Sequence, residues 1–409
     1  MKSSDNFTMW LVFAVLVAVA FPAAACLWDN DTLRAEAKGL PGMAEIITGR
    51  FERNPPLYFQ MRLERSERDI AADARNWNAY DNAGVSCDRL GKHTEAIEWM
   101  NRKRGAMEAA AEGDAATAEH RYRYLANLAT FHAHRWFASG ANRADTTDLE
   151  RGIELIEDAI ELNPDAHFGR ERYQLMAMRW VLNPPGDQNG LTELPTLFWA
   201  NEKYAELQNN RGSHTANNLR DAGLGDAVQG LGGLIALGNA WESLDVFFAL
   251  AFALNDNRNT ALAHLAKLRC IELIRNGKKS NHPSSPSGED LVKLIEYYGY
   301  QSRDEADVGA YFPKARANAD EWHKAREKFM LSRLQAGRHP DTDSTFWDGY
   351  VEVEAITIPN GILGYSRHAV YESAPLVFAA AVVAIVGILL IRLMRRLRLR
   401  REARAMTQS

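Results

Sequence analysis

The sequence predicts an all-α protein in which most of the chain forms pairs of antiparallel helices, with an apolar segment near each end. Through the middle of the chain, apolar residues recur at the three- and four-residue spacing of one helix face. Glycines and a Leu-Asn-Pro string interrupt this spacing where one helix ends and another begins. These observations predict a helix-turn-helix repeat solenoid with a signal peptide and one C-terminal transmembrane helix.

Composition and charge are those of a folded protein with an acidic middle region. Of 409 residues, 46% are hydrophobic and 25% are charged, as in ordinary globular proteins. Seven arginines and one glutamate give the last eighteen residues a net charge of +6, and the first 26 residues have a net charge of zero. The total of −5 therefore leaves −11 for the region between. An acidic surface repels phosphate, so we expect no nucleic-acid partner.

Residues 1–25 have the pattern of a secretory signal peptide. An uncharged apolar run from Met9 to Phe21 is followed by small residues that end at Ala25, directly before Cys26. A cysteine after small residues also resembles a lipoprotein signal, although Ala23 stands where leucine is usual in that family. A cleaved signal, a lipid on Cys26 and a retained anchor are all compatible with this pattern.

Residues 374–394 are predicted to cross the membrane. Ala374 to Ile391 is eighteen residues without a charge, and two further apolar residues bring it to the roughly 20 that a bilayer requires. A buried core helix is the alternative, but the basic tail that follows at 395–409 argues against it. Such a tail also invites a nucleic-acid or calmodulin-like interpretation, whereas an anchor on anionic lipid headgroups is simpler beside a membrane span.

The two ends together predict the topology. Positive charge stays on the cytoplasmic side of a membrane, so residues 27–373 should lie outside the cytoplasm and the C-terminus inside. A retained N-terminal anchor gives the same arrangement. We therefore expect a single-pass membrane protein whose repeat domain lies outside the cytoplasm, either in the periplasm or outside the cell.

The clearest helix pair covers residues 77–104. A small apolar face of the first helix consists of Tyr80, Ala83, Gly84 and Cys87, and the opposite face contains Asn78, Asp81, Val85 and Asp88. Gly91 ends this helix, and a second apolar stripe starts at Ala96. Because Gly84 and Ala96 have little or no side chain, they permit two antiparallel helices to approach closely.

This pair resembles the tetratricopeptide repeat (TPR) family. In that family an aromatic residue, a leucine-glycine pair and a tyrosine follow one another, and an alanine stands twelve residues after the glycine. Tyr80, Ala83-Gly84, Cys87 and Ala96 occupy those positions here. A second unit has a first-helix stripe and a helix that ends in Leu-Asn-Pro, with residues at the family spacing: Leu125, Leu128, Ala129, Gly152, Ile156, Ala159, Leu162 and Pro164. Ala129 and Gly152 are too far apart for the family, which predicts an insertion near residues 139–148. The resemblance covers residues 77–166.

The rest of the chain is predicted to be helical and repeat-like, with a short strand before the membrane. The expected segments are helices at 167–182, 259–276, 289–298 and 313–336, a helix pair at 226–254 turned at Gly238-Asn239, a linker at 276–290 and a strand or hairpin at 350–358. The resulting domains are a signal peptide (1–25), a TPR-like domain (26–276), a linker, helix and strand region (277–373), a transmembrane helix (374–394) and a cytoplasmic tail (395–409).

Motifs for chemistry are missing from the sequence. It has no His-Glu-x-x-His helix, glycine-rich phosphate loop, Gly-x-Ser-x-Gly elbow or Cys-x-x-Cys pair. His132 and His134 are two residues apart, so they point away from each other on a helix, and His132 is expected in the core. The acidic loop at 341–349 lacks the EF-hand glycine and glutamate, which favours a solvated turn over a calcium site. We expect no catalytic residues, metal or cofactor.

Cys87 and Cys270 each lie in a predicted amphipathic helix. Buried free thiols are favoured over a disulfide between distant repeats.

Binding is therefore the expected function. The resemblance implies a concave groove that holds a protein or peptide. The residues expected to face it, with a solvated face as the alternative, are Asn78, Asp81, Val85, Asp88, Arg89, Arg123, Thr130 and His134. Asp81 and Val85 stand where some family members carry a lysine and an asparagine that grip a peptide carboxylate, so that mode is not expected. The alternative is an enzyme or a cell-wall-binding envelope protein with its site in residues 184–373.

Overall fold

The computed structural model describes residues 27, 29, 41–109, 115–164, 169–185, 196–211, 218–297 and 305–359. In these residues the regular elements are all helices. In chain order they are α3 (Met43–Thr48), α4 (Pro56–Ala72), α5 (Trp77–Arg89), α6 (His93–Glu108), α7 (Ala115–Ala138), α8 (Thr147–Leu162), α9 (Arg170–Leu182), η2 (Leu197–Ala200), α10 (Glu202–Arg211), α11 (Asn218–Asp221), α12 (Ala227–Ala236), η3 (Ala240–Glu242), α13 (Leu244–Asp256), α14 (Thr260–Arg275), α15 (Glu289–Tyr297) and α16 (Glu305–Gln335).

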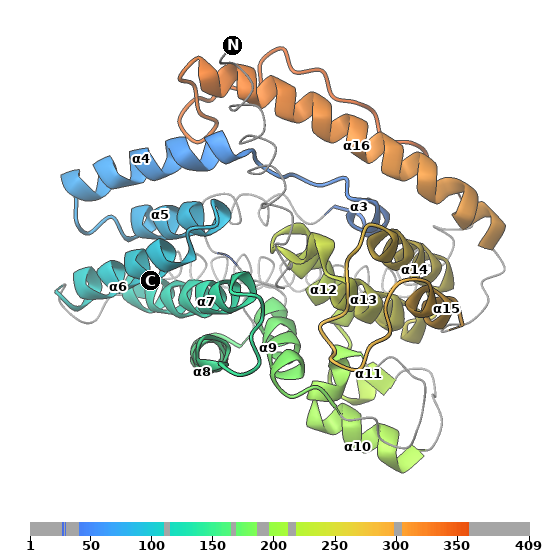
Figure 1. The fold of residues 1–409 in the computed structure, drawn as a ribbon. Helices are drawn as coiled ribbons and strands as arrows, with labels where there is room; N and C mark the ends of the chain where they lie inside the picture. The colour runs from blue at the N-terminus through green and yellow to red at the C-terminus, as the bar shows by residue number, and fades with distance from the viewer. Residues whose placement is uncertain are drawn as a thin grey trace, which may run out of the picture. The chain divides into compact units, whose positions relative to one another are not determined.

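Neighbouring helices in the chain pack against each other as antiparallel pairs. The most extensive packing joins α5 to α6, α7 to α8 and α13 to α14, and α4 packs on α5 in the same way (Figure 1). The connection between α5 and α6 is short because Gly91 has a φ of 76°, a backbone conformation that glycine adopts at no steric cost. The predicted all-α class and its sequential helix pairs are confirmed.

Two glycines lie where helices approach closely, as predicted. A Cβ atom on Gly84 would lie 2.8 Å from Cε of Met100 and 3.1 Å from Phe131, so α5 contacts both α6 and α7 there. A Cβ atom on Gly152 would lie 2.9 Å from the backbone oxygen of Ala129, which brings α8 against α7. Larger side chains at either glycine would push these helices apart.

The extra residues between Ala129 and Gly152 do not all form a loop. Helix α7 continues to Ala138, and residues 139–146 connect it to α8. The indole Nε1 of Trp136 donates hydrogen bonds to the backbone oxygens of Asn142 (3.2 Å) and Asp145 (2.8 Å), which hold this loop against the end of α7. The insertion is therefore divided between a longer helix and an ordered connection.

The later helices lie close to their predicted positions. The predicted pair at 226–254 consists of α12 and α13, and the side chain of Ser243 caps α13 by accepting a hydrogen bond from the backbone N–H of Val246. Helix α14 ends just before Gly277, whose φ is 83°. The long helix α16 begins at Glu305, eight residues before its predicted start, and contains Pro313.

The predicted linker at 276–290 has irregular backbone but does not separate two compact units. Contacts divide the chain into one unit from Met1 to Thr357, which holds all of the described helices, and a second from Ile358 to Ser409. The carboxylate of Asp245, on α13, accepts hydrogen bonds from Ser280 Oγ (2.6 Å) and from the backbone N–H of Asn281 (2.9 Å). These bonds fix the irregular segment to the helices.

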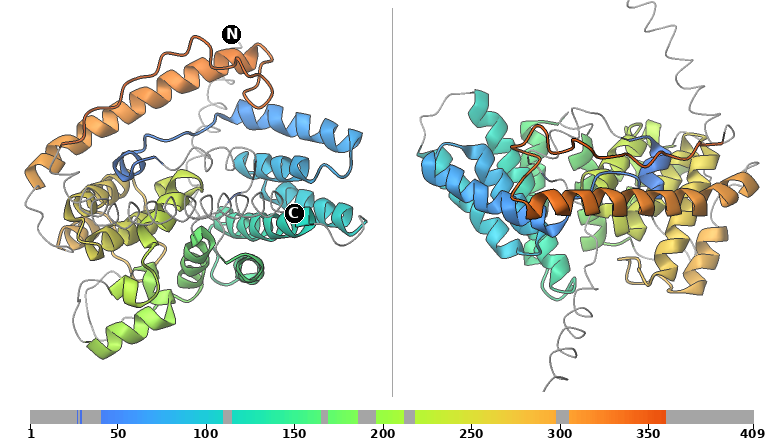
Figure 2. Two further views of the ribbon diagram at one scale, coloured as in Figure 1. Left: turned by 180° about the vertical axis from the view of Figure 1, so that it is seen from behind. Right: turned by 90° about the horizontal axis from the view of Figure 1, so that it is seen from above.

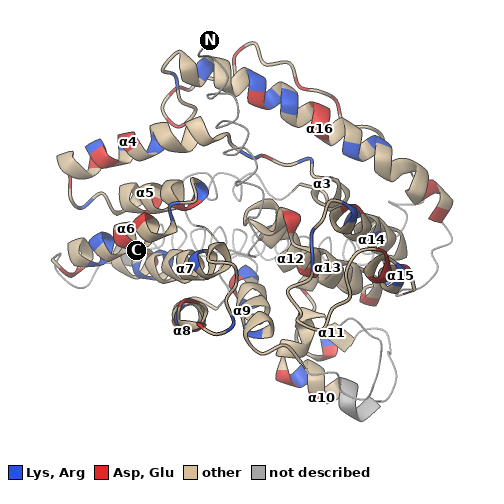
Figure 3. Ribbon diagram, in the orientation of Figure 1, with Lys and Arg blue, Asp and Glu red and all other residues tan. Residues whose placement is uncertain are grey.

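Helix α16 contacts α14, α3 and α4 in turn (Figure 1, Figure 2). Near α4 it contributes to a separate small core, whose buried members are Tyr58, Phe59, Met330, Leu334 and Phe346. Acidic and basic residues alternate along α16 (Figure 3). Helix α16 therefore links α4, which packs on α5, with α14, which packs on α13.

Trp241 is a second point where distant segments meet. The guanidinium of Arg269 lies 3.8 Å from the centre of the indole ring, and those of Arg53 and Arg316 lie at 4.9 Å and 5.3 Å. Cation–π contacts of this kind are favourable when the arginine is partly desolvated. They connect η3, α14, α16 and the segment before α4.

Residues 351–359 have no strand partner among the described residues. The residues after 359, in which a hairpin would place its second strand, lie outside the described part of the chain, so the hairpin stays a prediction. Asn318 of α16 donates a hydrogen bond of 2.9 Å to the backbone oxygen of Glu354, and Arg50 donates one to the backbone oxygen of Val353.

The predicted signal peptide, transmembrane helix and basic tail lie outside the described residues. Within the described part of the chain, no helix combines the length and the apolar character that crossing a membrane requires.

Candidate functional site

Most of the eight predicted groove residues lie inside the protein. Asn78 is exposed and Arg89 and Arg123 are half-buried, whereas the buried members are Asp81, Val85, Asp88, Thr130 and His134. Helix α5 is covered on several sides, by α4, α6 and α7. These five residues therefore do not face solvent as expected: α4, α6 and α7 cover the three on α5, whereas Thr130 and His134 of α7 contact Gln174 of α9 and Asp88 of α5.

Asp81 forms a buried ion pair with Lys103. Nζ of Lys103 lies 2.7 Å and 2.8 Å from the two carboxylate oxygens, and the side chains are 0% and 2% exposed. The amide of Asn127 donates a third hydrogen bond to Asp81, at 3.2 Å. Burial lowers the pKa of Lys103, and the Asp81 carboxylate opposes that shift. This pair joins α5 to α6, and Asn127 adds α7.

Thr130 and Arg123 have different surroundings, although both lie on α7. The hydroxyl of Thr130 accepts a hydrogen bond of 3.0 Å from the amide of Gln174 on α9. Arg123 donates hydrogen bonds to Asn78 (3.0 Å) and Glu119 (2.7 Å), and lies nearer the surface. Of the predicted groove, the pair Asn78 and Arg123 stays accessible.

Asp88, His93 and His134 form a cluster in which three helices meet. Nδ1 of His93, the first residue of α6, lies 2.8 Å from Oδ1 of Asp88 at the end of α5. Nδ1 of His134, on α7, lies 2.8 Å from both carboxylate oxygens of Asp88. Side-chain exposure is 0% for Asp88, 4% for His134 and 17% for His93. Solvent therefore reaches the cluster on the His93 side.

Two further residues surround this cluster. The amide Nδ2 of Asn239 lies 3.5 Å from Nε2 of His134. Arg89 donates a hydrogen bond to Oδ1 of Asn239 and another, at 3.0 Å, to the backbone oxygen of Leu237. Arg89 therefore joins the end of α5 to the turn between α12 and η3.

Electrostatics favours an ionised Asp88. Burial alone would raise the pKa of its carboxyl, but the hydrogen bonds and charges of His134 and His93 hold that pKa well below its usual range. Two imidazole nitrogens that converge on one carboxylate can bind a metal ion, and the described residues contain this one group of three such ligands. The same arrangement also orients each imidazole through Asp88, as in a general-base pair.

The neighbouring histidine of α7 differs from its prediction. His132 was expected in the core, but its side chain is 14% exposed and its Nδ1 lies 2.8 Å from Asp148. His134 is the buried one of the two. Their contacts with different carboxylates agree with the prediction that they cannot share one metal ion.

The acidic loop at 341–349 is a largely exposed run of turns, as predicted, but the Asp341 side chain in it is buried. Asp341 pairs with Arg62 at 2.9 Å and also with Arg65, and Arg62 in turn contacts Asp29 at 2.7 Å. Burial would raise the pKa of Asp341, but these arginines lower it below its usual range. Because its carboxylate is neutralised by arginines, this loop is not suited to calcium.

Cys87 and Cys270 are both buried and free, as predicted. Burial raises the pKa of the Cys87 thiol to about 12, so it is not a reactive thiolate at neutral pH.

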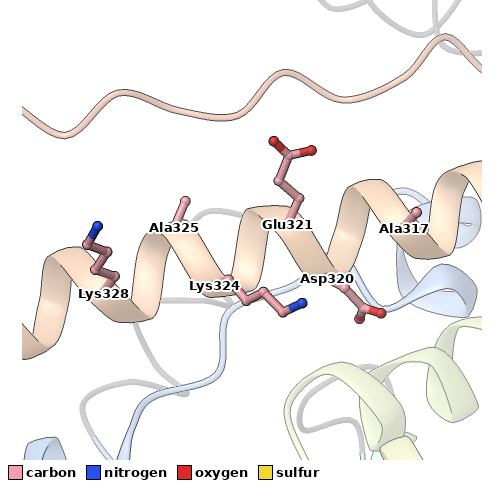
Figure 4. Close-up of a pocket in the computed structure, with 6 residues that line it drawn as sticks. All are labelled: Ala317, Asp320, Glu321, Lys324, Ala325 and Lys328. Carbon is pink, nitrogen blue, oxygen red and sulfur yellow. The ribbon is translucent and has the colours of Figure 1, made fainter.

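One hollow among the described residues, of about 550 Å³, lies along one face of α16 (Figure 4). Its lining residues all belong to this single helix, namely Ala317, Asp320, Glu321, Lys324, Ala325 and Lys328. A much smaller hollow, of about 20 Å³, lies between α9 and α13. Side chains on one exposed helix face do not converge on a substrate from several directions.

Sequence reasoning missed His93, Lys103 and Asn239 as members of these networks. His93 follows Asp88 by five residues across the turn at Gly91, and this short reversal returns its side chain to the end of α5. That spacing was visible in the sequence. The contact of Asn239 with His134 joins residues 105 apart, and no local pattern predicts it.

No protein-family model, no curated protein and no solved structure matches the chain.

Proposed function

We propose that the protein is a membrane-tethered scaffold of TPR-like helix pairs that binds a protein partner outside the cytoplasm and has no catalytic activity of its own. The observation that carries this proposal is the sequence of antiparallel helix pairs from α4 to α9. Stacked helix pairs build extended binding surfaces, and they are rarely built around one catalytic pocket.

The TPR-like part of the proposal is supported by local packing. Gly84, Ala96, Gly152 and Ala159 occupy the positions at which the family needs small residues. All four are buried, and Gly84 and Gly152 lie where neighbouring helices approach closely. The longer α7 and the eight-residue connection to α8 depart from a regular repeat. Packing of the first pair therefore favours the family more strongly than packing of the second.

The membrane tether is supported by the sequence alone. Residues 374–394 are apolar and are followed by a basic tail, and residues 1–25 have the pattern of a secretory signal. A tether of this kind raises the effective concentration of the scaffold for partners at the membrane.

Burial of the polar residues of α5 restricts where a partner can bind. Asp81 and Asp88 are neutralised inside the protein, so they cannot contact a partner. Asn78 is exposed at the start of α5, and beside it Arg123 of α7 pairs with Glu119 and keeps 13% of its side chain exposed. Because the region as a whole has a net charge of −11, we place an acidic or hydrogen-bonding segment of the partner at Asn78 and the exposed edge of the Arg123 guanidinium.

Charge reversal at Arg123 tests the proposal. The full-length chain is purified in detergent from native membranes, and co-purified proteins are quantified by mass spectrometry. Arg123→Glu is expected to reduce the amount of a specific partner at least about fivefold, roughly 1 kcal/mol of binding, because the rim contact becomes repulsive. Its melting temperature should change little.

Arg151→Glu is the matched control. Arg151 lies on the exposed face of α8 and pairs with its neighbour Glu154, the two side chains being 48% and 64% exposed. It reverses the same charge on the same domain. Equal partner recovery from both variants and wild type would exclude the Arg123 surface, and failure to recover any protein reproducibly would reject the scaffold proposal.

A further inference from the structure

The geometry points to a binding site for a divalent transition-metal ion, of which zinc is the best fit, formed by Asp88, His93 and His134. The metal-binding atoms of these side chains all lie within 4.8 Å of one another. They come from α5, α6 and α7, so a bound ion would join three helices that the sequence places in separate segments. This inference does not depend on partner binding.

The donor set selects the class of ion. Two imidazole nitrogens and one carboxylate oxygen suit zinc and neighbouring transition metals, whereas calcium and magnesium take oxygen ligands almost exclusively. Three protein ligands leave one coordination position for water. The partly exposed edge of His93 provides an entry path, because the other two side chains are almost fully buried.

Metal binding requires only a local change in hydrogen bonding. Both Nδ1 atoms already point at Asp88, at 2.8 Å. An ion at the centre replaces these two hydrogen bonds, so each neutral imidazole carries its proton on Nε2 instead of Nδ1. For His93 the Nε2 proton can reach solvent, because that side chain is 17% exposed.

Asn239 supplies the outer support for His134. Its side-chain amide faces Nε2 of His134 at 3.5 Å, and a rotated amide would present its oxygen to the Nε2 proton. Arg89 would then lose its contact with Asn239 but keep the backbone oxygen of Leu237, at 3.0 Å. A hydrogen-bond acceptor behind a metal-bound histidine fixes the ring and strengthens the ligand.

Metal content and affinity test this site in the full-length chain, purified in detergent with its affinity tag removed. The protein is treated with a chelator, dialysed and titrated with Zn²⁺, and bound metal is counted by mass spectrometry. Wild type is expected to bind one Zn²⁺ per chain and to melt at a higher temperature with the ion. His93→Gln should weaken the affinity at least about 100-fold, because a ligand is lost.

His132→Gln is the matched control. His132 lies two residues from His134 on α7 and also contacts an aspartate, Asp148, at 2.8 Å, but lies outside the cluster. This variant should bind zinc as wild type does. If wild type fails to retain stoichiometric Zn²⁺, or if His93→Gln and His132→Gln bind it equally well, the site is rejected.

X-ray absorption at the zinc edge identifies the atoms around the ion in the wild-type protein, and it tests the site even if His93→Gln does not fold. The expected spectrum has nitrogen and oxygen scatterers at about 2.0 Å, with the outer-shell signature of two imidazole rings. A sulfur scatterer, or fewer than two imidazoles, would overturn the assignment.

Discussion

The buried pair of Asp81 and Lys103 gives the sharpest test of how α5 is oriented. At 2.7–2.8 Å, two unit charges attract by about 6 kcal/mol at an effective dielectric constant of 20. Removing both charges from water costs several kcal/mol per ion, so the intact pair contributes little net stability. Lys103→Met, however, leaves the buried Asp81 carboxylate with Asn127 as its hydrogen-bond donor and with His120 Nδ1 at 3.6 Å, and should cost about 3–5 kcal/mol at a pH where His120 is neutral.

A double-mutant cycle measures this coupling. Asp81→Asn combined with Lys103→Met removes both charges, so the double variant should be more stable than Lys103→Met alone. Urea unfolding of the full-length protein, followed by tryptophan fluorescence, reports the free energies. Lys92→Met is the control, because Lys92 and its partner Glu95 are 49% and 52% exposed, and it should cost less than about 0.5 kcal/mol. If Lys103→Met lowers the free energy of unfolding by less than about 1 kcal/mol, Asp81 is not buried as described and faces solvent, as the sequence predicted.

Two other predictions concern packing and pH. Gly152→Ala places a methyl group 2.9 Å from a backbone oxygen of α7 and should lower the free energy of unfolding by about 1–3 kcal/mol. Gly105→Ala is the control, because the space at its Cβ is open, and it should be neutral or stabilise by up to about 1 kcal/mol. Equal melting temperatures for the two variants would contradict the contact between α7 and α8. Burial lowers the pKa of His339 to about 4, so the unfolded chain takes up its proton first, and stability should fall as the pH drops from 6.5 to 4. His339→Gln should flatten this part of the stability curve, and an unchanged slope would contradict the burial of the neutral ring.

The helix pairs could be predicted because their signals are local. Gly84, Ala96 and Gly152 mark close approaches at fixed distances along the chain, and Gly91, Pro164 and Gly277 follow the ends of α5, α8 and α14. The same periodicity placed α12, α13 and α14 to within a few residues. Local spacing determines which residues share one helix face, and that information was sufficient for the fold class.

The surroundings of each face could not be predicted in the same way. Asp81 and Asp88 were expected toward a groove because a polar residue opposite an apolar stripe usually meets solvent. Both are buried because Lys103 and two histidines from other helices neutralise them. A buried charge is stable only with such partners, and the partners come from segments whose packing one helix does not reveal.

The C-terminal part of the described chain illustrates the same limit. Asn318 of α16 donates a hydrogen bond to the backbone oxygen of Glu354, 36 residues further along the chain. Arg62 and Asp341 pair across 279 residues, and this pair buries one carboxylate of the acidic loop. Neither contact has a local signal, because each joins segments that meet only when the chain has folded.

Photo-crosslinking in the native membrane tests the central claim, a partner-binding scaffold outside the cytoplasm, most directly. A photoreactive amino acid replaces Asn78, which is exposed beside Arg123, and a control chain carries it at Arg151 on the exposed face of α8. We predict a discrete adduct between residue 78 and one extracytoplasmic protein, with none from residue 151. No adduct at residue 78, the same adducts from both positions, or adducts with cytoplasmic proteins would contradict the account.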